Sequence, residues 1–190
     1  MIKKKYFLLI ILCFFISRSD AIEIKSLVVI DNANITNYDF IKNIELIKIL
    51  EQREISKSEH HAILSNIIDT KIKELELKNF SLEIDNEKIE KKVNLIFEKK
   101  LQNQQINSDV KKLLNRKIEI EEKWNRLILI KFKNKLEINI NEINEIAKLS
   151  NFSDKKKEDL IMMQKNKKIN IISKTYFNEV KSKYLIKIVE

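Results

Sequence analysis

Short apolar runs alternate with polar breaks along the chain, and the first run after the N-terminal region has the spacing of a β-hairpin. Residues 27–30 are apolar and include two adjacent valines, which favour an extended backbone. Asp31 and Asn32 follow, and in a chain without glycine they are the residue types that best tolerate positive φ in a two-residue turn. Ile35 then continues a second strand. The segment therefore predicts a hairpin.

A two-stranded hairpin is only marginally stable in water, so another segment must cover it. The best candidate is the last apolar run, residues 184–189. We therefore expect both ends of the chain to meet in one small sheet, with helices between them. The predicted fold class is mainly α: a compact multi-helix module whose β-hairpin is joined by a C-terminal helix and strand.

Between these ends, apolar residues recur every three or four positions, which is typical of amphipathic helices. Capping residues mark several helix starts, among them Thr36 with Asp39 and Ser56 with Glu59. The helices that we expect cover residues 38–52, 56–79, 85–101, 108–114, 118–136, 139–149 and 170–180. Because polar breaks interrupt the apolar stripes about every dozen residues, they favour a packed helical domain over a long coiled coil.

Residues 150–168 are the most polar part of the chain and include the charged run 154–159. We interpret them as a linker, with room for a helical turn at residues 160–163. On this interpretation the helical domain covers residues 22–149, and residues 169–190 supply the closing helix and strand of the same module.

The N-terminus has the pattern of a signal peptide. Residues 3–5 are lysines, residues 6–16 are apolar, and Ser19 and Ala21 are small residues at the positions that a signal peptidase recognises. The apolar run is shorter than the roughly 20 residues of a spanning helix. We therefore predict that residues 1–21 are removed between Ala21 and Ile22 and that the mature chain is exported without a membrane span. An uncleaved membrane anchor is the alternative.

Composition narrows the classes of function. Cys13 lies inside the apolar run of the signal peptide, so the mature chain would hold no cysteine and no disulfide. The net charge of +9 is compatible with a nucleic-acid partner or an anionic membrane. However, Lys and Glu are interspersed and neither an arginine patch nor an aromatic stacking platform is present. We interpret the charges as solvated helix faces and expect no nucleic-acid partner.

Catalytic motifs are missing from the sequence. His60 and His61 are adjacent, so on a helix they point in different directions and cannot bind one metal ion together. Without glycine there is neither a phosphate-binding loop nor a glycine-flanked nucleophile turn. We therefore expect no enzyme activity, metal site or cofactor. Trp124 and Phe132 share one helical stripe and are candidates for the core, with binding of another protein as the alternative.

Several weak motifs resemble one known family in the same order along the chain. They are the strand, turn and helix start of residues 28–40, the helix segments 61–69 and 84–90, and the closing segments 166–170, 176–181 and 185–188. Together they resemble the SurA family of periplasmic chaperones. Ala33 stands where the family has Gly. Typical members also insert one or two parvulin-type prolyl isomerase domains before the closing helix. Residues 150–165 are too few for such a domain, so the chain resembles a reduced form without it.

This resemblance implies a monomeric, ATP-independent periplasmic chaperone that binds unfolded outer-membrane proteins, its clients, during transport and assembly. Trp124 and Phe132 are the candidate client-binding residues. Two alternatives remain open. One is the peptidyl-prolyl isomerase activity that a family label would assign, and the other is a periplasmic helical adaptor or a trimeric coiled-coil holdase of the Skp type.

Overall fold

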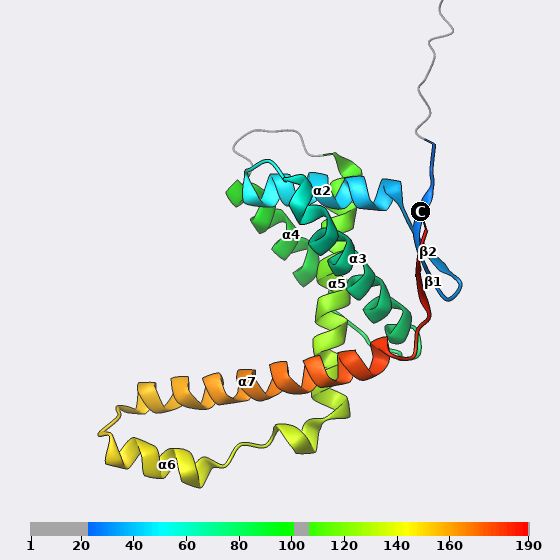
Figure 1. Ribbon diagram of the computed structural model, residues 1–190. Coiled ribbons are helices and arrows are strands. Elements are labelled where there is room, and N and C mark those ends of the chain that lie inside the picture. The colour runs from blue at the N-terminus through cyan, green and yellow to red at the C-terminus, as the bar shows by residue number, and fades with distance from the viewer. Residues whose placement is uncertain (1–22, 101–106, 190) are drawn as a thin grey trace, which may run out of the picture.

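The computed structural model describes residues 23–100 and 107–189 and is mainly helical, with one small antiparallel sheet (Figure 1). The strands are β1 (Ser26–Ile30), β2 (Ala33–Thr36) and β3 (Ile186–Ile188). The α-helices are α2 (Asn37–Glu51), α3 (His60–Leu77), α4 (Asn86–Lys100), α5 (Ser108–Lys131), α6 (Ile140–Leu149) and α7 (Asp154–Lys181). Two 3₁₀-helices are η1 (Lys57–Glu59) and η2 (Lys133–Leu136). The predicted signal peptide and its cleavage site between Ala21 and Ile22 lie outside the described residues.

The sheet joins the two ends of the described chain, as the hydrophobic pattern predicts. Its strand order is β2-β1-β3, and β3 pairs antiparallel with β1 so that Val28 lies opposite Ile188. At the hairpin turn Asp31 adopts a φ of 48°, whereas Asn32 does not take a positive φ. Val28 and Ile30 are fully buried because this face of the sheet packs on the helices. The predicted hairpin and its covering strand are confirmed.

Side-chain caps begin several helices at the predicted places. At the start of α2, the backbone N–H of Thr36 donates to Asp39 Oδ2 over 2.8 Å, and the N–H of Asp39 donates to Thr36 Oγ1 over 3.2 Å. Ser56 and Glu59 form a second capping box, at η1, which leads into α3. These reciprocal bonds satisfy backbone donors that a helix start otherwise leaves without partners.

Residues 108–131 form one continuous helix. The prediction of two separate helices over residues 108–114 and 118–136 is therefore wrong. The intervening residues are Asn115, Arg116 and Lys117, none of which stops a helix as Gly or Pro would. Leu114 and Ile120 are both buried, so the apolar face continues across the expected break.

The linker predicted at residues 150–168 is also wrong, because most of it is the first half of α7. Ser153 caps this helix by accepting a hydrogen bond from the N–H of Lys156. Lys, Glu and Met favour helices even when the segment is polar, and α6 packs along it. Asn170, at which the last predicted helix begins, therefore lies inside α7.

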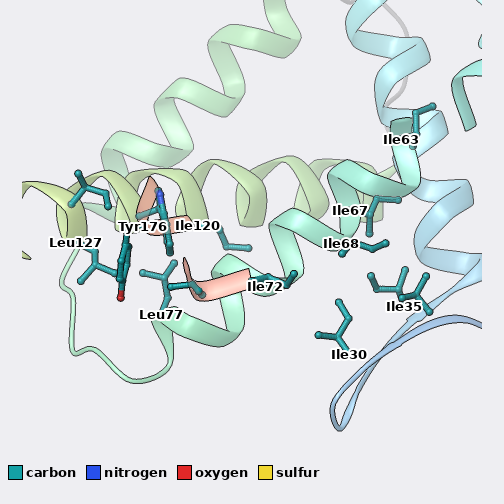
Figure 2. Packing of buried hydrophobic residues seen from close by; sticks show 14 residues of the cluster. Ile30, Ile35, Ile63, Ile67, Ile68, Ile72, Leu77, Ile120, Leu127 and Tyr176 are labelled. Atoms are coloured by element: carbon teal, nitrogen blue, oxygen red, sulfur yellow. The ribbon is translucent and has the colours of Figure 1, made fainter. Parts of the chain in front are cut away.

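The core lies in two clusters that share α5. The larger one joins the sheet, α3, α5 and the C-terminal half of α7, and Figure 2 shows Ile30 and Ile35 of the hairpin close to Ile68 and Ile72 of α3. The smaller one joins α2, α4 and α5 around Val93. Outside both clusters, α6 and the N-terminal half of α7 form an antiparallel helical hairpin, residues 140–168, which we call the arm. The arm extends away from the rest of the protein (Figure 1), so the protein is less compact than expected.

Candidate functional site

Trp124 of α5 lies in the core and attaches α7 to α5. Its side chain is 1% exposed, its indole Nε1 donates a hydrogen bond to Ser173 Oγ over 2.9 Å, and its ring stacks on Tyr176 with centroids 5.5 Å apart. Phe177 contacts the same indole edge-on at 6.0 Å. Because these neighbours cover the ring, Trp124 offers no surface to an unfolded client in this structure.

Phe132 belongs to the same aromatic group but lies at its edge. The residue follows the end of α5, is half-buried, and contacts Tyr176 edge-on at 5.4 Å. Tyr176 in turn donates its hydroxyl to Glu76 Oε1 over 2.6 Å. Burial and this hydrogen bond to a carboxylate both raise the pKa of Tyr176 above its ordinary value. The group therefore fixes the base of the arm to α3 and α5.

The arm carries much of the exposed apolar surface of the described residues. On α7, one side of the helix holds a row of exposed residues at helical spacing, which we call the methionine stripe: Met162, Met163, Asn166, Lys167, Asn170 and Ile171. Met162, Met163 and Ile171 are each more than half exposed. At 100° per residue, Met162 and Asn166 lie opposite the half-buried residues Leu160, Ile161 and Gln164, and Met163 lies at the edge of that side. This part of α7 is therefore exposed among the described residues.

A groove between α4 and α5 adds a second apolar surface. Ile84, Ile89 and Leu129 form its apolar lining. Charged residues of the two helices, and Asp85 just before α4, complete the groove: Asp85, Lys88, Lys92, Glu122 and Arg126. Lys92 Nζ and Glu122 Oε1 form an exposed ion pair of 2.9 Å across it. We call this surface the α4–α5 groove.

These two surfaces belong to segments that extend to the same side of α5. In Figure 1, α4 and the arm both project to the left of α5, with α6 on the far side of α7 from α4. A client would have to extend from α4 to α7 to contact both surfaces at once.

A smaller pocket beneath α2 holds polar groups of a different kind. Asn43 is 4% exposed, and its Nδ2 donates to the backbone oxygen of Asp39 over 2.8 Å, while Oδ1 has no hydrogen-bond partner among the described residues. Lys117 lines the same pocket, and burial lowers the pKa of its amine. Lys117 Nζ donates to Asn66 Oδ1 over 3.2 Å. Asn43 Oδ1 is itself covered, so it presents no acceptor to a ligand.

The histidines occupy separate environments. His60 is half-buried and contacts Phe40 edge-on with ring centroids 5.3 Å apart, whereas His61 is exposed. Within residues 23–100 and 107–189, no three His, Cys, Asp or Glu residues lie close enough to hold a metal ion. In the same part of the chain, no helix is long and apolar enough to cross a membrane.

The methionine stripe did not emerge from the sequence, although a signal was present. Its members recur at intervals of three and four residues inside the segment interpreted as a linker. Lysines and asparagines separate its apolar members along the sequence, so the 3.6-residue period of the apolar positions is hard to recognise there. Comparison of the chain with protein-family models and with curated proteins finds no match in either case.

Proposed function

We propose that this protein is an ATP-independent periplasmic chaperone that holds unfolded outer-membrane proteins in an extended form during their transport. The proposal is supported by the ordered resemblance to the SurA family and by the two apolar surfaces on one side of α5. Isomerase activity is not part of it, because α6 ends at Leu149 and α7 begins at Asp154, which leaves no room between them for a parvulin-type domain.

The observation that carries the proposal is the methionine stripe. Methionine is unbranched and polarizable, so a methionine surface adapts to many apolar side chains instead of selecting one. Such surfaces are common on proteins that bind many partners. A chaperone that accepts many unfolded chains needs this adaptability more than it needs close shape complementarity.

The size of the surfaces fits reversible binding. Fully burying one Met or Ile side chain stabilises a complex by about 1.5–3 kcal/mol. Ordering an unfolded client and fixing its position oppose this gain by several kcal/mol. The balance favours weak contacts that form and break without an energy source, as a carrier without a nucleotide site requires.

Suppression of aggregation tests the proposal. A urea-unfolded outer-membrane barrel is diluted into buffer with or without residues 22–190, and light scattering is followed. We expect the chain to suppress scattering, and Met162→Glu/Met163→Glu or Leu129→Glu to reduce the suppression. Ile41→Glu is the matched control, because Ile41 is 47% exposed on α2, away from both surfaces. Equal aggregation with and without the wild-type chain would exclude the proposed function.

Two further results would contradict different parts of the proposal. Catalysed isomerisation of a proline-containing peptide would make the protein an enzyme. Loss of client binding upon Ile41→Glu to the same extent as upon Met162→Glu/Met163→Glu would show that binding does not depend on the stripe.

A further inference from the structure

The tip of the arm, residues 148–157, contains the turn of the helical hairpin and exposes two apolar side chains. Leu149 is 87% exposed and Phe152 is 38% exposed. Both lie at the turn that connects α6 to α7 (Figure 1). The described residues leave Leu149 almost uncovered and cover more than half of Phe152. Single exposed apolar residues are common on protein surfaces, but Leu149 has the largest exposed fraction of the large apolar side chains in the described residues.

The turn between these residues is ordered by its own backbone. The N–H of Phe152 donates to the oxygen of Ala147 over 2.9 Å, and the N–H of Asn151 donates to the oxygen of Lys148 over 3.3 Å. Asn151 has a φ of 49°, so it takes the left-handed position that glycine usually fills in such a helix end. Ser153 then caps α7. Because these polar groups are bonded internally, the tip can enter a medium of low polarity at a smaller cost.

Lysines surround the two apolar residues. The tip contains Lys148, Lys155, Lys156 and Lys157 and one acidic residue, Asp154, and the acidic residues Glu158 and Asp159 follow directly along α7. Lys156 Nζ lies 5.8 Å from the centre of the Phe152 ring, so a positive charge is close to one of the two apolar side chains. Lysine side chains can extend along an apolar surface while their amines stay in a polar layer.

We propose that the arm tip docks on an anionic phospholipid surface, with Leu149 and Phe152 entering the interface and the lysines at the level of the lipid phosphates. Apolar residues backed by lysines are the pattern of segments that lie in a membrane interface without crossing it. A nucleic acid fits less well for two reasons. The tip contains no arginine, and its single aromatic ring, Phe152, cannot stack on several bases in succession. This inference does not depend on the proposed chaperone function.

Vesicle flotation tests the docking. Every described helix and strand lies within residues 22–190, so this chain is mixed with vesicles of equal parts phosphatidylglycerol and phosphatidylcholine, or of phosphatidylcholine alone. We expect flotation only with the anionic vesicles, weakening as salt increases. Leu149→Glu/Phe152→Glu and Lys148→Ser/Lys155→Ser/Lys156→Ser should each weaken the partition on the order of ten-fold or more.

Matched controls separate the tip from general charge. Lys91→Ser/Lys99→Ser/Lys111→Ser removes the same charge from exposed positions on α4 and α5, and Ile41→Glu changes an exposed apolar residue on α2. Both controls should float like the wild type, and all variants should keep the wild-type circular dichroism. Equal loss in the control and tip lysine variants would overturn the proposal, as would full flotation of Leu149→Glu/Phe152→Glu. Binding to single-stranded DNA or polyglutamate without binding to vesicles would also overturn it.

Discussion

Asp31 and Leu185 are 154 positions apart and exchange two hydrogen bonds. The N–H of Asp31 donates to the backbone oxygen of Leu185 over 3.0 Å, and the N–H of Leu185 donates to Asp31 Oδ1 over 2.9 Å. The residue that makes the hairpin turn therefore also holds the segment that enters β3. This pair connects the two ends of the described chain directly, so β3 depends on the turn as well as on its pairing with β1.

Replacing Asp31 should separate its two roles. Asp31→Asn keeps an oxygen acceptor and a residue type that tolerates positive φ, whereas Asp31→Ala loses both. We expect Asp31→Ala to lower the free energy of unfolding by about 1–3 kcal/mol and Asp31→Asn to lower it by less than half as much. Urea denaturation followed by circular dichroism measures both. Equal stability of the two variants would show that the side-chain bond to Leu185 is unimportant.

Acid should weaken the start of α3 through Glu59. The hydrogen bonds from Arg53 and from the backbone and side chain of Ser56 lower the pKa of Glu59 from 4.5 to about 2. A carboxyl group with a lowered pKa stabilises the fold fully above pH 4.5, and this contribution is lost as the pH falls towards 2. The stability difference between wild type and Glu59→Gln should therefore be constant above about pH 5 and shrink below it. A difference that stays constant down to about pH 2 would contradict the assigned cause.

Trp124 should behave as a core residue in solution. It is the single tryptophan of the chain, so its fluorescence reports one site. We expect a blue-shifted emission, weak quenching by iodide, and a loss of about 3–5 kcal/mol of unfolding free energy upon Trp124→Ala. Trp124→Phe, which keeps a ring but loses the bond to Ser173, should cost less. Strong quenching of the folded wild type would place the indole at the surface instead.

The arm should enlarge the protein in solution. A compact chain of the mature length has a radius of gyration of about 15 Å. Because α6 and half of α7 extend beyond the core, small-angle scattering of residues 22–190 should give a clearly larger value. A value of about 15 Å would mean that the arm folds back onto the α4–α5 side.

The elements that could be predicted from the sequence are those with local signals. The hairpin has β-branched residues and an Asp-Asn turn, and the caps at Thr36 and Ser56 have their partner three residues later. In the first half of α7 the local signals disagreed. Its many lysines suggested a linker, whereas its helix propensity and the cap at Ser153 favoured a helix.

The candidate site was harder to predict than the fold. Trp124 and Phe132 share an apolar stripe, but a stripe does not reveal whether a side chain faces the core or another protein. Exposure of the methionine stripe depends on which part of α7 packs against α6, which is a tertiary relationship. Only the position of the two helices shows that Met162 and Met163 remain exposed.

Site-specific photocrosslinking tests the central claim most directly. A photoreactive group is placed at Met163 or, as the matched control, at Ile41, and each protein is mixed with an unfolded outer-membrane barrel or with the same barrel folded in detergent. We predict strong crosslinks from position 163 to the unfolded barrel only, and few from position 41. Equal crosslinking from both positions, or none from position 163 in a protein with native circular dichroism, would contradict client binding at the methionine stripe.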